Sequence, residues 1–291
     1  MPQRRAILLA LPAMMLSPAL PGCAWMRNFG GGRPAAPVCV LSPDASKEEV
    51  IAYLNANTSK LMAWRTDRAM ISVRGKVGIP IRVPASIAVE SPRNFRLIAH
   101  GPVMGGKEAD FGSNAEHFWF WNKQNEEKYV FRARHEEDPN RMRRFPIPFQ
   151  PDWIMESLGV IEIAPDQVTM QPGEPGKQNV TLWADRISAQ GFKVRKATVV
   201  DTCQGVVREH VLYDARGQLI ARAVLSGHVP DARSLVVLPT RIDLDWPQAQ
   251  LGITMTLSEI EVNPPHFPAQ TWRVPDYPGY KIWDLGRDGS P

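Results

Sequence analysis

Short segments in which apolar and polar residues alternate run through most of this chain. In the segment 67–78, Ile71 and Val73 alternate with Ser72 and Arg74. Successive side chains of a strand point to opposite faces, so this alternation predicts strands with one buried and one wet face. Pro, Gly and Asn residues separate the segments, which indicates an antiparallel meander. The predicted strands cover residues 67–78, 86–90, 94–100, 107–113, 116–123, 127–134, 178–186, 191–201, 205–214, 218–228, 234–246 and 250–262.

One predicted strand, from His117 to Trp121, is apolar on both faces. Phe118 and Phe120 point to one side of this strand, and Trp119 and Trp121 point to the other. Such a strand is either covered on both faces or lines an apolar cavity. A slip of one residue in its register would exchange the two aromatic pairs.

A first helix is predicted over 46–64. Ser46 and Glu49 have the spacing of a capping box, which marks a helix start. Apolar residues then recur at helical spacing and form a single stripe that needs a sheet to pack on. The residues of this stripe are Val50, Ile51, Leu54, Leu61 and Met62.

A second, shorter helix is predicted over 151–158. Pro151 stands at its start and Gly159 follows its end, which is the usual asymmetry of these two residues. The prolines of 145–151 predict a rigid, extended linker before it. Together with the strands, these helices predict an α+β fold that is mostly antiparallel β.

The N-terminus has the pattern of an export signal. Arg4 and Arg5 precede an apolar stretch, 6–16, that is too short to span a bilayer. The run Leu-Pro-Gly-Cys that ends at Cys23 resembles the lipobox of bacterial lipoproteins, which are cut before this cysteine and acylated on it. The alternative is a plain signal peptide with an accidental cysteine. Several acyl chains would hold the protein at a membrane, because each buried CH₂ adds about 0.8 kcal/mol.

These patterns divide the chain into four parts. We predict a signal peptide over 1–22, a flexible tether over 23–45, and one folded domain over 46–263. The last part, 264–291, is a Pro-rich tail that either runs extended along the surface or serves as a docking segment.

Composition and charge exclude some functions. The formal net charge of +4 falls to about +2 without residues 1–22, and this weak excess does not suggest nucleic acid. The six histidines are scattered, and neither a nucleophile–base motif nor a metal-ligand spacing is present. We therefore expect a protein that is not an enzyme, with no metal site and no cofactor. Cys39 and Cys203 either pair after export or remain two buried thiols.

The order of elements resembles the LolA/LolB superfamily of lipoprotein carriers and receptors, and is closer to its LolB-like branch of outer-membrane lipoproteins. The resemblance spans most of 46–262, and no single stretch is a sharp motif. This chain departs from the family in two respects. It is longer, chiefly through 165–205 and the tail, and its apolar loop has Val-Met in place of Leu. The stretches that carry the resemblance are 70–76, 95–106, 146–148 with 153–159, and 239–244 with 250–260.

The resemblance implies an open half-barrel of about 11 strands whose helices cover an apolar cavity. The cavity would hold acyl chains of lipoproteins or phospholipids. In the receptor branch an apolar loop helps lipoproteins into the membrane, and by position Val103 and Met104 are its candidates here, unless this loop folds back onto the core. The candidates for lining the cavity are chosen by strand parity, that is, by which of the two faces of its strand each residue occupies. They are Ile71, Val73, Phe95, Leu97, Phe118, Phe120, Ile242 and Leu244.

The sequence thus predicts an envelope protein anchored through Cys23 that takes part in lipoprotein or lipid localisation. A periplasmic carrier protein is the expected partner. Ala24 follows the anchor, and the absence of Asp there favours the outer membrane, with the domain facing the periplasm. The alternative is a sensor or scaffold of the same fold whose cavity has collapsed. A carrier takes up lipid and apolar dye, whereas a scaffold does neither.

Overall fold

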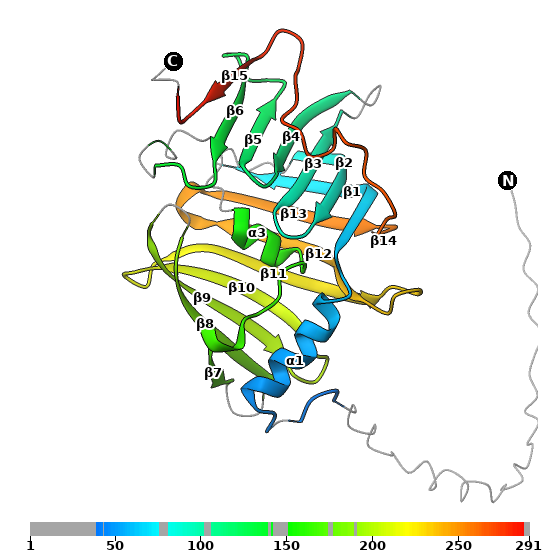
Figure 1. The fold of residues 1–291 in the computed structure, drawn as a ribbon, viewed down its shortest axis with the longest axis vertical. Coiled ribbons are helices and arrows are strands. Elements are labelled where there is room, and N and C mark those ends of the chain that lie inside the picture. The colour runs from blue at the N-terminus through cyan, green and yellow to red at the C-terminus, as the bar shows by residue number, and fades with distance from the viewer. Residues whose placement is uncertain are drawn as a thin grey trace, which may run out of the picture. The chain divides into compact units, whose positions relative to one another are not determined.

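The structure, a computed structural model, describes residues 39–42, 44–75, 81–101, 106–138, 141, 151–173, 177–188 and 191–287. Within these residues one open sheet of 15 strands is accompanied by two α-helices (Figure 1). The first half of the chain contributes β1 (Ala63–Arg74), β2 (Ile81–Glu90), β3 (Asn94–His100), β4 (Lys107–Ser113), β5 (His117–Asn122) and β6 (Tyr129–Arg134). The second half contributes β7 (Thr169–Pro172), β8 (Asn179–Ile187), β9 (Lys193–Asp201), β10 (Val206–Asp214), β11 (Leu219–Pro230), β12 (Val237–Trp246), β13 (Leu251–Ser258), β14 (Glu261–Val262) and β15 (Lys281–Asp284).

The strands of the first half of the chain and those of the second half form one sheet, because β1 pairs with β13. The sheet runs in the order β15-β6-β5-β4-β3-β2-β1-β13-β12-β11-β10-β9-β8-β7, and β14 also pairs with β1. β1 and β13 are antiparallel, with Ile71 opposite Met255. Every neighbouring pair that we describe is antiparallel except β15 and β6. The predicted α+β fold with a mostly antiparallel, open sheet is therefore confirmed.

The expected count of about 11 strands is wrong for the described residues, since strands of only two to four residues carry no alternation that a sequence pattern can detect. β7, β14 and β15 are such strands. They pair because neighbouring strands offer free backbone groups, and this depends on the tertiary arrangement.

Helix α1 (Lys47–Thr58) begins as predicted and ends earlier. Ser46 and Glu49 form the reciprocal capping box at its start. Val50, Ile51 and Leu54 are its buried residues. The chain turns after Thr58, so the predicted extension to residue 64 is wrong, and Met62 is exposed rather than part of the stripe. The residues from Ala63 onward belong to strand β1 instead, because they pair with β2 and β14.

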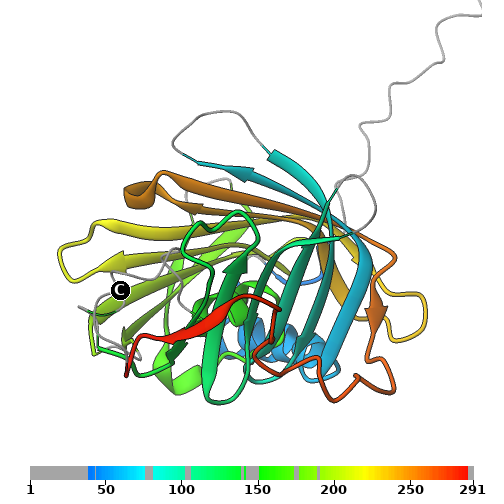
Figure 2. The same cartoon turned by 90° about the horizontal axis from the view of Figure 1, so that it is seen from above.

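Helix α3 (Pro151–Ser157) matches the predicted short helix. Its chain reverses at Gly159, which has a positive φ of 82° that residues with a side chain rarely adopt. We call the sheet face that α1 and α3 cover the inner face, and the opposite one the outer face. Figure 2 shows the strands curving around the two helices. Short 3₁₀ turns at Pro165–Gln167 and Pro247–Ala249 connect the remaining elements.

A disulfide joins Cys39 to Cys203, across 164 residues of sequence. Backbone hydrogen bonds from Val40 to Cys203 and from Leu41 to Thr202 flank it. The first described residues of the chain are thereby fastened to the turn between β9 and β10. Of the two alternatives that the sequence left open for these cysteines, the structure contains the bonded form.

The C-terminal segment, residues 264–287, covers part of the outer face and extends the sheet. β15 pairs in parallel with β6, and Trp283 is buried beside Phe131. Tyr277 stacks on Trp121 with ring centroids 3.8 Å apart. Both faces of β5 are therefore covered, because Phe118 belongs to the inner-face core while Trp119 and Trp121 form a separate cluster under this segment.

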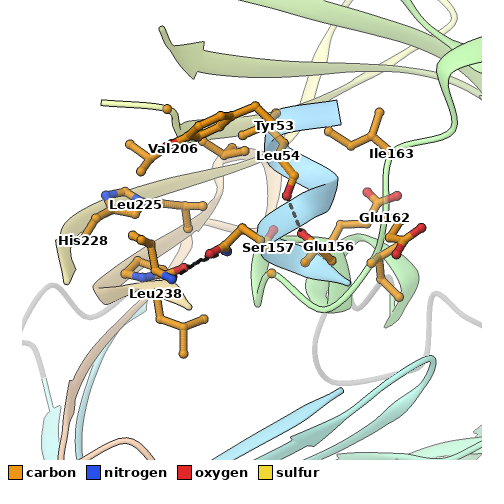
Figure 3. A pocket seen from close by; sticks show the side chains of 18 of the residues that line it. Tyr53, Leu54, Glu156, Ser157, Glu162, Ile163, Val206, Leu225, His228 and Leu238 are labelled. Atoms are coloured by element: carbon orange, nitrogen blue, oxygen red, sulfur yellow. Dashed lines mark hydrogen bonds between the residues drawn. The ribbon is translucent and has the colours of Figure 1, made fainter. Parts of the chain in front are cut away.

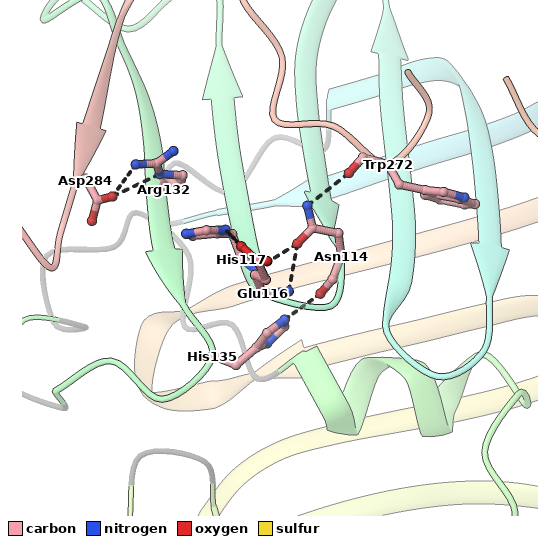
Figure 4. Close-up of polar contacts among 7 residues, drawn as sticks. All are labelled: Asn114, Glu116, His117, Arg132, His135, Trp272 and Asp284. Atoms are coloured by element: carbon pink, nitrogen blue, oxygen red, sulfur yellow. Dashed lines mark hydrogen bonds and ion pairs between the residues drawn. The ribbon is translucent and has the colours of Figure 1, made fainter. Parts of the chain in front are cut away.

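Polar contacts hold the same segment to β5 and β6 (Figure 4). The Asn114 side chain donates to the carbonyl of Trp272 at 3.0 Å and accepts from the backbone of His117. The Arg132 guanidinium donates from Nε to Asp284 at 3.0 Å. His135 contacts the carbonyl of Asn114 at 2.7 Å. The contacts of Asn114 and Arg132 thus attach the C-terminal segment to the sheet, whereas the contact of His135 joins the end of β6 to the turn before β5.

Candidate functional site

The inner face carries one extended apolar cluster, and the structure brings all eight predicted cavity residues into it. Six of them are at least nine-tenths buried, whereas Val73 and Phe120 are half-buried at its margin. Helix α3 packs directly on this cluster through Trp153, whose ring meets that of Trp246 edge-to-face at 5.8 Å. In this structure the eight residues therefore belong to one packed cluster that also includes side chains of α3. The cluster contains Ile71, Val73, Phe95, Leu97, Phe118, Phe120, Ile242 and Leu244.

A pocket of about 270 Å³ opens on the inner face between α1, the end of α3 and strands β8 to β12. Figure 3 shows Tyr53 and Leu54 of α1 on one side of it, with Leu225, His228 and Leu238 on another. None of the eight predicted residues lines this pocket. Its apolar walls come from Leu54, Ile161, Ile163, Val206, Val207, Leu225, Val237 and Leu238.

Three charged side chains form a compact group in this pocket, and we call it the ion cluster: Glu156, Arg186 and Lys196. Lys196 Nζ lies 2.5 Å from Glu156 Oε2, and an Arg186 amino group contacts the other carboxylate oxygen. The side chains of Glu156 and Lys196 are 8% and 5% exposed. Burial by itself raises the pKa of Glu156, but Lys196 and Arg186 outweigh it and lower this pKa to about 2. Glu156 is therefore a carboxylate at neutral pH.

His210 lies beside the ion cluster on β10. It is 4% exposed, and its Nδ1 is 3.2 Å from the hydroxyl of Thr198. Burial, together with the positive charges of Lys196 and Arg186, lowers the pKa of His210 well below its ordinary value. His210 is therefore neutral at pH 7, and the cations beside Glu156 are Lys196, whose pKa burial lowers, and Arg186.

A smaller pocket, of about 90 Å³, lies on the other side of the ion cluster. Pro151, Trp153 and Ser188 line it, and the ion cluster lines it as well. The three charged residues thus line two cavities beside α3. Clustered titratable groups with shifted pKa values inside a cleft are typical of functional sites.

The ion cluster was not among the residues predicted from sequence, although the sequence contains a signal for it. Arg195 and Lys196 are adjacent in a predicted strand, and adjacent side chains point to opposite faces. One of them must therefore face the interior. The structure places Arg195 on the outer face above Trp183, at 4.5 Å from its ring centroid, and Lys196 on the inner face.

Several predicted residues lie outside the described part of the chain. These are the anchor Cys23 and the loop residues Val103 and Met104. No helix within the described residues is long and apolar enough to cross a membrane. Within those residues, no group of three or more His, Cys, Asp or Glu side chains could hold a metal ion.

Comparison by sequence finds no relative. No protein-family model matches the chain, and no curated protein matches it either. Comparison by structure does find similar proteins. A DUF1329 family protein from Desulfovibrio piger aligns over 77% of this chain and 95% of its own, with a TM-score of 0.53 and 10% sequence identity.

Two further solved structures are similar to this chain. A proposed outer membrane lipoprotein-sorting protein domain from Vibrio parahaemolyticus aligns over 78% of this chain and 97% of its own, with a TM-score of 0.50 and 8% identity. A LolA superfamily protein from Nitrosomonas europaea aligns over 79% and 98%, with a TM-score of 0.48 and 10% identity. At these sequence identities the similarity concerns the fold alone. The fold assignment rests on the proteins from Desulfovibrio piger and Vibrio parahaemolyticus, which have TM-scores of 0.53 and 0.50. The chain thus shares its fold with a DUF1329 family protein and with a lipoprotein-sorting domain.

Proposed function

We propose that this chain is a lipid-anchored protein of the bacterial envelope that binds acyl chains of lipoproteins or lipids on the inner face of its sheet. The observation that carries the proposal is the pocket between α1 and α3, whose apolar walls continue into the apolar cluster of the inner face. The shared fold with a lipoprotein-sorting domain supports the same reading. The protein would act as a carrier or receptor and not as an enzyme.

The free energy available from such a pocket is adequate. Removing about 200 Å² of acyl-chain surface from water contributes roughly 5 kcal/mol before the costs of association. The described pocket, at about 270 Å³, is slightly smaller than the 300–1,000 Å³ that is usual for small-molecule sites. A long acyl chain would therefore fit only if α3 shifts and uncovers the eight cluster residues, from Ile71 to Leu244, which we retain as its proposed contacts.

The proposed location depends on the N-terminus. Acylation of Cys23 would hold the domain at the outer membrane, facing the periplasm, and a periplasmic carrier protein would deliver the cargo.

We further propose that the loop with Val103 and Met104 contacts the membrane or the cargo. Met104→Asp should then slow transfer of a bound lipid to vesicles without weakening binding, and unchanged transfer kinetics would exclude this role.

Native mass spectrometry tests the central proposal. The full chain, carrying Cys23→Ser so that it has no acyl group of its own, would be exported, purified without detergent and measured intact. Additional mass of the size of a lipid or an acylated peptide supports the carrier function and identifies the class of cargo. A protein that has no bound mass and takes up no neutral apolar dye contradicts it.

One observation favours a second candidate. Trp153 of helix α3 packs on the inner-face cluster, and the two pockets beside α3 measure about 270 and 90 Å³, as expected for a protein of this fold whose cavity has collapsed. Such a protein would be an envelope sensor or scaffold. The same measurements separate the two candidates, because a scaffold would bind neither lipid nor dye.

A further inference from the structure

The ion cluster carries one more positive than negative charge. Lys196 and Arg186 both contact the single carboxylate of Glu156, and Lys196 is almost completely buried. The other charged residues that line the pocket, Glu162 and Lys60, are exposed and opposite in sign. Lys196 and Glu156 are both buried, whereas 34% of the Arg186 side chain is exposed, so the excess charge lies on the pocket side of the cluster, where an anion could pair with it.

Arg186 also has a donor that is not used. Its Nε is buried and has no hydrogen-bond partner within the described residues. Buried donors in folded proteins almost always have an acceptor, so such an atom requires an explanation. Arg186 lines both cavities beside the ion cluster, and an acceptor that enters either of them could reach this side chain.

The rest of the pocket is suited to an apolar chain. From the ion cluster, the inner face continues along β10 and β11 to Val207 and Leu225, and then to Leu238 on β12. Leu225 and Leu238 are buried residues of the inner-face cluster. The pocket thus combines a cationic end with apolar walls, which is the complement of an amphiphile.

We propose that this pocket binds an amphiphile with an anionic headgroup, a phosphate or a carboxylate, which Arg186 and Lys196 hold while the acyl chain lies against Leu225 and Leu238. The inference rests on the proposed acyl-chain function and names the class of ligand. The guanidinium of Arg186 matches the oxygens of phosphate and carboxylate in geometry, and hydrogen bonds between charged groups are the stronger ones. Glu156 orients the two cations from α3.

Isothermal titration calorimetry with three probes tests the inference on the full chain carrying Cys23→Ser. Decyl phosphate and decanol have the same chain and differ only in the headgroup, whereas inorganic phosphate supplies the headgroup alone. We expect decyl phosphate to bind about tenfold or more tightly than decanol, the order expected of a hydrogen bond between charged groups. Inorganic phosphate should bind much more weakly than decyl phosphate.

Three variants locate the headgroup. Arg186→Gln should reduce the preference for decyl phosphate over decanol to less than about threefold, because it removes the cation and its donors. Arg186→Lys should restore part of the preference, because it returns the charge without the planar set of donors. Arg195→Gln is the matched control, since Arg195 lies on the outer face of β9 and 56% of its side chain is exposed. Circular dichroism checks that each variant is folded.

The outcomes separate this inference from the proposed function. Equal affinities of the wild type for decanol and decyl phosphate overturn the headgroup site and leave acyl-chain binding standing. A strong preference that survives Arg186→Gln places the headgroup elsewhere and overturns the assignment. Inorganic phosphate that binds as tightly as decyl phosphate shows a simple anion site and overturns the amphiphile. Failure of all three probes to bind contradicts both proposals.

Discussion

The phenol of Tyr277 donates a hydrogen bond of 2.6 Å to the completely buried carboxylate of Asp110. Arg96 contacts the same carboxylate through two nitrogens, at 2.6 and 3.2 Å, and the indole of Trp119 donates to it at 3.2 Å. Burial and the charge of Asp110 raise the pKa of Tyr277, so its proton stays in place. A residue of the C-terminal segment thus completes a buried charge pair on the outer face.

Tyr277→Phe should lower the free energy of unfolding by about 1.5–3 kcal/mol, since it removes a hydrogen bond to a buried charge and retains the stacking on Trp121. Urea unfolding measures this change. Tyr280→Phe is the matched control, because its hydroxyl donates to the carbonyl of Lys123 in an exposed position and should matter little. Equal effects of the two changes would contradict the role of Tyr277 in the charge pair.

Gly112→Ala should destabilise the protein by about 1–3 kcal/mol or more through overpacking. A Cβ at residue 112 would lie 2.2 Å from the indole of Trp119, which is buried under the C-terminal segment and has no room to move. Thermal unfolding would detect the loss. Gly75→Ala, at a position where a Cβ meets no atom within 4 Å, should leave the melting temperature almost unchanged.

The stability of the protein should fall below pH 6.5, in part because of His210. Its pKa in the folded protein is lowered, so the unfolded chain binds a proton first as the pH decreases. The free energy of unfolding then falls by up to about 1.4 kcal/mol per pH unit for this one group. Urea titrations between pH 7 and 5 should give a shallower slope for His210→Gln than for the wild type. A slope for His210→Gln equal to that of the wild type would contradict this role of His210.

Reduction of the disulfide should lower stability by roughly 2–5 kcal/mol, because Cys39 and Cys203 close a long loop in the unfolded chain. Unfolding with and without reductant measures the effect. The variant with both Cys39→Ser and Cys203→Ser should be insensitive to reductant. A wild type that responds no more than this variant would show that the bond contributes nothing to stability.

Phe120→Glu should abolish binding of an apolar dye or lipid while the protein stays folded, since Phe120 is half-buried at the margin of the inner-face cluster. A carboxylate at this half-buried position would oppose an acyl chain. Phe192→Glu is the control, at a side chain that is 55% exposed. Binding that survives in a folded Phe120→Glu protein would show that this part of the inner face does not hold the chain.

Strand parity predicted the inner face well. Ile71, Phe95 and Ile242 lie in different strands, yet their alternation with polar neighbours places them in one cluster. Parity could not show that α3 covers this cluster, nor that α1, β10 and β11 together enclose the pocket. Those features depend on which segments meet in space, and segments far apart in sequence leave no mutual signal in a single chain.

Local sequence by itself determined the start of α1 at its capping box, the short helix between Pro151 and Gly159, and most long strands, because these depend on neighbouring residues. Only the tertiary structure decided the pairing of β1 with β13, the hydrogen bond from Tyr277 to the buried carboxylate of Asp110, and the contact of Glu156 with Lys196. Burial of charged and aromatic side chains is stable only when distant partners satisfy them, and folding alone brings those partners together.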